Sequence, residues 1–106
     1  MSESRKYGLL EKDLEKIVSI FKSNPGVEEL LLFGSRAKGN NVSGSDIDLA
    51  IKGKGLNLDD ILKAKSEIDK LSLPYKTDII IYERIKDIDL VDHIDRAGIS
   101  LFKRQP

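Results

Sequence analysis

A short apolar run stops abruptly at a glycine in the stretch Glu29-Leu30-Leu31-Leu32-Phe33-Gly34-Ser35-Arg36. A continuous apolar run of this length, ended by a turn residue, predicts a β-strand that is buried on both faces. The following residues, 36–45, are rich in glycine and asparagine, and we expect a short helical turn and then a loop. The fold should therefore contain a central strand that leads directly into a glycine-serine turn.

The rest of the chain alternates between helical and strand patterns. Apolar residues recur at helical spacing in three segments, whose stripes are Leu10, Leu14, Ile17, Val18 and Phe21; Leu58, Ile61, Leu62, Ile68 and Leu71; and Ile88, Val91 and Ile94. Further strands are predicted over 46–51, 77–82 and 99–102. Asn57 is a plausible N-cap of the second helix, and Gly98 is expected at C′ of the last one. The predicted order is α-β-α-β-α-β-α-β.

Composition limits the classes of protein to consider. The chain has 106 residues, of which 40% are hydrophobic and 34% charged, and we expect one soluble domain over residues 1–106. Its 18 basic and 18 acidic residues balance, so nucleic acid is not expected as the primary partner. The lack of cysteine excludes disulfides, thiolate metal sites and cysteine nucleophiles. No apolar run is long enough for a membrane span or a signal core, so a cytoplasmic protein without membrane contact is expected.

The glycine-serine turn has the features of a phosphate site. Gly34 lets the backbone approach a ligand closely, and the free N–H groups at a helix start favour an anion. Ser35 adds a hydroxyl donor, while Arg36 and Lys38 add positive charge. Taken alone, these residues fit an ordinary turn with Ser35 as N-cap at least as well. The turn needs a second feature before it indicates a nucleotide.

Carboxylates on the next two predicted strands supply that feature. Asp46 and Asp48 are two residues apart, so on a strand both side chains lie on one face. Such close carboxylates repel unless a cation or a proton intervenes, and Mg²⁺ shares carboxylates readily with substrate phosphates. Asp78 could complete the group if the two strands are neighbours. Each part alone fits solvated side chains, but together they indicate metal-assisted nucleotidyl transfer.

The paired motif also resembles a known family. Gly34-Ser35, ten intervening residues and Asp46-Ile47-Asp48 resemble the G-S-x10-D-x-D signature of the polymerase-β-type nucleotidyltransferases. The chain looks most like the minimal nucleotidyltransferase (MNT) domains, on the residues Leu32 to Gly39, Ser45 to Leu49, Thr77 to Ile80 and His93 to Phe102. Lys38 stands where arginine is more usual, which keeps the charge. The resemblance covers nearly the whole chain.

The resemblance implies an α/β (α+β) fold with a mixed β-sheet of about four strands flanked by helices. It implies that Asp46 and Asp48 hold two Mg²⁺ ions on the triphosphate of ATP. Asp78 would bind a catalytic metal and act as, or position, the base toward the acceptor hydroxyl. Ser35, with the Gly34 backbone, would hold the β- and γ-phosphates.

Family members of this size typically pair with a helical HEPN-domain protein. The resemblance thus implies an Mg-dependent nucleotidyltransferase that transfers AMP from ATP to a tyrosine of a HEPN ribonuclease toxin, acting as its antitoxin in a hetero-oligomer. Two alternatives stay open: a non-catalytic antitoxin that masks its partner sterically, and a nucleotidyltransferase that acts on a small molecule.

Two residues of the last predicted helix lie outside its apolar stripe. His93 has no second histidine or cysteine for a metal site, so a structural or exposed position is expected. Leu90 is expected to be exposed, where it could mark a partner surface or be an ordinary surface leucine.

Overall fold

The computed structural model describes residues 4–41 and 44–105. The described strands are β1 Arg5–Lys6, β2 Leu9–Leu10, β3 Glu29–Phe33, β4 Ile47–Lys52, β5 Thr77–Ile81 and β6 Ile99–Lys103. The α-helices are α1 Glu11–Lys22, α2 Ser35–Lys38, α3 Leu58–Asp69 and α4 Ile88–Ala97, and a short 3₁₀ helix follows β5 at Tyr82–Arg84. No helix in these two ranges is long and apolar enough to cross a membrane.

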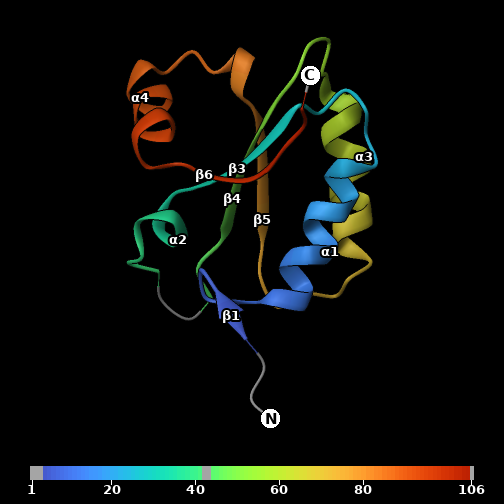
Figure 1. Ribbon diagram of the computed structural model, residues 1–106, viewed down its shortest axis with the longest axis vertical. Helices are drawn as coiled ribbons and strands as arrows, with labels where there is room; N and C mark the ends of the chain where they lie inside the picture. The colour runs from blue at the N-terminus through green and yellow to red at the C-terminus, as the bar shows by residue number, and fades with distance from the viewer. Residues whose placement is uncertain (1–3, 42–43, 106) are drawn as a thin grey trace.

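Four strands form a mixed sheet in the order β5-β4-β3-β6. β3 is antiparallel to both β4 and β6, whereas β4 and β5 are parallel and are joined through α3 (Figure 1). A parallel pair needs such a crossover because its strands run in the same direction. The mixed sheet flanked by helices that the resemblance implied is confirmed.

The two faces of the sheet have different cover. On one face, α1 and α3 pack over alternate strand residues, and this larger core includes Ile47, Leu49, Ile51, Ile79 and Ile81. On the other face, α4 packs over a smaller cluster of Leu31, Phe33, Ala50 and Ile94 (Figure 1). Because side chains alternate along a strand, Asp48 and Asp78 share the face that α4 covers only in part.

A small hairpin before α1 is not indicated by the sequence pattern. β1 and β2 pair antiparallel across Tyr7 and Gly8, whose φ angles are 56° and 78°. Two successive positive φ angles are typical of the type I′ turn, which suits the twist of a two-residue hairpin. Each strand has only two residues, too few for a period-two pattern to be visible.

The apolar face of α3 differs from the predicted stripe. Leu58 and Leu62 are 60% and 54% exposed, whereas Ala64 and Ile68 are buried against the core. Ile61 is partly buried against the same core, so the inward face follows the spacing i, i+3, i+7. The prediction was wrong for the two leucines because Leu58 and Leu62 lie off the inward line of Ile61, Ala64 and Ile68.

The inward face of α4 also differs from its prediction. Ile88 is 80% exposed, and Leu90, expected at the surface, is partly buried in the cluster around Ile94. The helix starts at its N-cap Asp87, later than the predicted residue 85. Gly98 is the C-cap with extended backbone, not a left-handed C′ residue, and an added Cβ there would overlap the carbonyl oxygen of Ile94.

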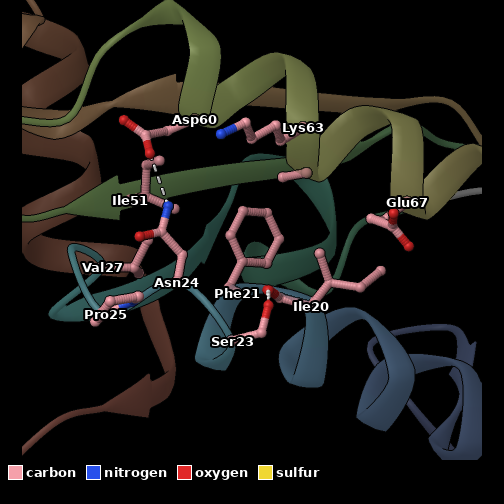
Figure 2. A pocket seen from close by; sticks show the side chains of 11 residues that line it. Ile20, Phe21, Ser23, Asn24, Pro25, Val27, Ile51, Asp60, Lys63 and Glu67 are labelled. Atoms are coloured by element: carbon pink, nitrogen blue, oxygen red, sulfur yellow. Dashed lines mark hydrogen bonds between the residues drawn. The ribbon is translucent and has the colours of Figure 1, made fainter.

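The predicted N-cap of α3 is confirmed and extends into a larger hydrogen-bond group. Asn57 Oδ1 accepts from the N–H of Asp59 at 3.0 Å, and Asp60 Oδ2 accepts from the N–H of Asn57 at 2.8 Å. Asp60 Oδ1 also accepts from the amide of Asn24 at 2.8 Å, across a cleft of about 300 Å³ between α1 and α3 (Figure 2). The bonds from Asn57 and then Asn24 lower the pKa of Asp60.

We predict that Asp60→Ala lowers the free energy of unfolding by about 1 kcal/mol at neutral pH, because the helix start loses its capping carboxylate. The pKa of Asp60 is lowered by folding, so its stabilisation is present above the ordinary value of 3.8 and is lost as pH falls through the folded value. Urea unfolding repeated from about pH 6 down to about pH 3 should show the difference from the parent shrink.

The matched control is Asp59→Ala, which removes a carboxylate from the same helical turn. Asp59→Ala should lower the free energy of unfolding by less than Asp60→Ala at neutral pH, because Asp59 contributes its backbone N–H and not its side chain to the cap. Equal losses of unfolding free energy in the two variants would contradict the capping role of Asp60. They would mean that both carboxylates act only through their charge near the N-terminus of the helix.

Candidate active site

The sheet register brings two of the predicted carboxylates together. Asp48 and Asp78 are paired Cα partners on the parallel strands β4 and β5. Adjacent strands lie about 4.8 Å apart, and the paired side chains project from the same face. Asp46 precedes β4 and is exposed, so it lies next to the strand and not on it as predicted. The two strands are neighbours, so the condition for Asp78 to join the group is met.

Electrostatics show that these groups interact. The pKa of Asp48 is raised, first by burial and then by the negative charges of Asp78 and Asp46. The positive charge of Arg36 acts in the opposite direction. At neutral pH the site therefore carries an unfavourable concentration of negative charge that a cation would relieve.

Gly34 lies against this cluster. Phe33 pairs with Asp48 across β3 and β4, so the chain turns beside the carboxylate immediately after that pair. Gly34 has φ 79° and ψ −154°, and an added Cβ would overlap the Asp48 carboxylate. Glycine is needed here both for the backbone conformation and for the space. Gly34 is also the N-cap of α2, so the alternative that Ser35 is the N-cap is wrong, and no side chain caps this helix start.

Arg36 has a different position from the phosphate contact expected from the sequence. Its side chain is buried, with Nη1 donating to the Tyr7 carbonyl at 2.8 Å and Nη2 to the Ser45 carbonyl at 2.6 Å. The guanidinium also lies 4.7 Å from the centre of the Tyr75 ring. Arg36 thus ties the glycine-serine turn to the N-terminal hairpin and to the segment before β4. Lys38, at the end of α2, is exposed.

His93 is the residue of the site that the sequence pattern missed. Its Nε2 accepts the backbone N–H of Gly34 at 3.1 Å, although 59 residues separate the two in the chain. The ring also meets Phe33 edge to face, with centroids 6.2 Å apart and planes at 72°. A lone histidine gives no sequence signal for such a contact, which depends on how α4 packs over the sheet.

The carboxylates suit a hard cation that is bound jointly with a substrate. Within residues 4–41 and 44–105, no three His, Asp or Glu side chains are grouped so that they alone would hold a metal ion. Mg²⁺ does not require such a cage, because it commonly binds one or two carboxylates and completes its shell with substrate phosphates and water. The oxygen donors of Asp48 and Asp78, in register on neighbouring strands, fit that mode.

Comparison with known proteins places this geometry in a family. A family model described as polymerase beta, nucleotidyltransferase matches residues 15–106. The chain belongs to this family. The matched range includes Asp46, Asp48 and Asp78 and the glycine-serine turn, which lie at one end of the neighbouring strands β3, β4 and β5. A search of curated proteins gives no match.

Solved structures share the fold. A chain of a toxin–antitoxin complex with AMP-PNP is 22% identical, with a TM-score of 0.72 over 87% of this chain and 74% of that one. A chain of a complex of tri-AMPylated Shewanella oneidensis HEPN toxin with MNT antitoxin is 18% identical, with a TM-score of 0.67 over 90% of this chain and 73% of that one. A putative nucleotidyltransferase from Sulfolobus solfataricus is 20% identical, with a TM-score of 0.53 over 98% of this chain and 93% of that one. At such identities the likeness shows a common fold.

We predict that the two basic residues of α2 differ in their effect on stability. Arg36→Met should lower the free energy of unfolding by about 2–3 kcal/mol, because a buried side chain is lost and two partly buried carbonyls lose their charged donor. Lys38→Met, on the same short helix but exposed, should change it by less than about 0.5 kcal/mol. Thermal unfolding distinguishes the pair, and similar melting temperatures for both variants would contradict the structural role of Arg36.

Proposed function

We propose that this chain transfers AMP from ATP to a tyrosine hydroxyl of a partner HEPN ribonuclease, and that it acts in this way as an antitoxin. The observation that carries the proposal is the register of Asp48 with Asp78 beside the Gly34-Ser35 turn. The family match supports the reaction class. The solved complexes that share the fold, one with AMP-PNP and one with an AMPylated HEPN toxin, support the nucleotide and the acceptor.

The glycine-serine turn is proposed to bind the β- and γ-phosphates. Gly34 leaves the space beside Asp48 open, which a side chain would fill. Ser35 follows at the uncapped start of α2 and offers its hydroxyl and its N–H. The exposed Lys38 adds a mobile positive charge at the end of the same helix. Arg36, buried on protein carbonyls, supports the turn from behind.

The three carboxylates are proposed to bind Mg²⁺, as two ions, together with the triphosphate. Asp46, Asp48 and Asp78 provide the oxygen donors, and the raised pKa of Asp48 reflects the negative charge that a cation would neutralise. Bound there, Mg²⁺ would stabilise charge on the triphosphate and polarise its α-phosphate.

Asp78 is proposed to serve the acceptor. It is exposed, whereas its partner Asp48 is half-buried, so an incoming hydroxyl reaches Asp78 from solvent. The tyrosine oxygen attacks the α-phosphorus, the bond between the α-phosphorus and the bridging oxygen breaks, and pyrophosphate leaves. The Asp78 carboxylate accepts the proton of the hydroxyl.

A protein acceptor fits the surface next to Asp78. An apolar groove of about 290 Å³ crosses the edge strand β5, and its lining includes Ile80, Leu58 and Leu90. Ile80 lies two residues from Asp78 on the same strand face, so the groove lies near the proposed acceptor position. Such a groove favours a partner with an apolar docking face, and we assign it to the HEPN ribonuclease.

The reaction is tested by intact-mass measurement. The chain is incubated with ATP, Mg²⁺ and a HEPN-domain ribonuclease from the same genome, and AMP should appear on a tyrosine of the ribonuclease as its activity falls. Asp78→Asn should slow the transfer by about 100-fold or more, because the proton acceptor and a metal ligand are lost together. Asp59→Asn, an exposed carboxylate on α3, should transfer AMP at the parent rate.

The alternatives give different outcomes. If the ribonuclease is neutralised without a change of mass, also by Asp78→Asn, the chain masks its partner sterically and does not modify it. If ATP is consumed only when a small-molecule hydroxyl compound is added, the acceptor is not a protein. Undiminished transfer by Asp78→Asn would contradict the mechanism.

A further inference from the structure

His93 connects α4 to the start of the glycine-serine turn. Its Nε2 accepts the N–H of Gly34 at 3.1 Å, and its ring packs edge to face on Phe33, the last residue of β3. Because Phe33 and Asp48 form the last pair between β3 and β4, the Gly34 N–H lies just beyond the ladder. The imidazole thus takes up a backbone donor that the sheet does not use.

The hydrogen bond from the Gly34 N–H to His93 restrains a backbone segment that glycine makes flexible. Gly34 adopts φ 79° and ψ −154°, a conformation that glycine reaches easily and leaves as easily. The Asp48 carboxylate leaves no room for a Cβ on Gly34. Gly34 therefore has no side chain whose packing could fix the conformation of the turn. A hydrogen bond to the Gly34 N–H selects one orientation of the peptide between Phe33 and Gly34, from which the chain continues into Ser35.

The bond also changes what Gly34 itself can contribute. A backbone N–H that donates to an imidazole is not available to a phosphate oxygen. The donors at this turn are then the N–H and hydroxyl of Ser35, at a helix start without a side-chain cap. Gly34 contributes space and conformation, and its N–H serves as the point at which the turn is held.

We propose that His93 is a positioning residue for phosphate binding: it fixes the Gly34 peptide so that Ser35 meets the β- and γ-phosphates. The inference rests on the nucleotide role proposed above for this turn. His93 acts through Gly34 and not on the reacting atoms. Acceptance at Nε2 means that the neutral ring carries its proton on Nδ1.

The test compares three variants by their affinity for ATP in the presence of Mg²⁺, measured by calorimetric titration. His93→Phe keeps an aromatic ring against Phe33 but has no acceptor, and should weaken ATP binding about fivefold, the value of one net hydrogen bond. His93→Gln places an amide oxygen near the position of Nε2 and should return the affinity to within about twofold of the parent. Arg96→Ala, which breaks an exposed ion pair with Asp92 on the same helix, should bind ATP like the parent.

Unfolding temperatures without nucleotide separate positioning from a merely structural role. A merely structural role predicts that His93→Phe and His93→Gln lower the unfolding temperature alike and that His93→Gln fails to restore ATP binding. That result would overturn the inference. Parent-like affinity in His93→Phe would also overturn it, while leaving the transfer reaction intact. If the parent chain itself binds no ATP, the proposed function fails first and this inference falls with it.

Discussion

The strand register at the end of β3 is the constraint on which the rest of the site depends. It sets Phe33 opposite Asp48, and Asp48 opposite Asp78, so three consecutive strands place the turn and two carboxylates side by side. A shift of one residue would send each aspartate into the apolar core on the other face. The apolar residues that alternate with them, including Ile47, Leu49 and Ile79, hold the register because they are fully or almost fully buried.

This register brings negative charges close together, and a nearby positive charge reduces the resulting repulsion. The burial of Asp48 and the charges of Asp78 and Asp46 raise its pKa, while the positive charge of Arg36 opposes the shift. Arg36 also holds the glycine-serine turn, through its hydrogen bonds to the carbonyls of Tyr7 and Ser45, and His93 holds the same turn through the Gly34 N–H. The residue that moderates the negative charge of the site is therefore also one of the two that hold the glycine-serine turn.

Much of the fold could be predicted from the sequence because its strands have clear patterns. The run ending at Phe33 and the alternation after Asp46 correspond to β3 and β4, and Asn57 caps α3 as expected. The sequence left open whether the strands of Asp48 and Asp78 are neighbours, since spacing alone does not order strands.

What the sequence could not show depends on tertiary packing. The two-residue strands of the hairpin have no visible period, and the exposure of Leu58 and Ile88 depends on how each helix is rotated against the sheet. Long-range hydrogen bonds gave Arg36 and His93 their positions, and no local pattern records a partner that lies 29 or 59 residues away.

The most direct test of this account is the unfolding temperature of Asp48→Asn against the parent as a function of pH, without and with Mg²⁺ and ATP. Folding raises the pKa of Asp48, so the parent loses stability as pH rises through the folded value, and the neutral amide avoids that loss. The account predicts that the variant melts above the parent at neutral pH without metal, that the gap closes as pH falls toward 3.8, and that Mg²⁺ with ATP raises the melting temperature of the parent alone. A variant that melts below the parent at neutral pH, or that Mg²⁺ with ATP stabilises equally, would contradict it.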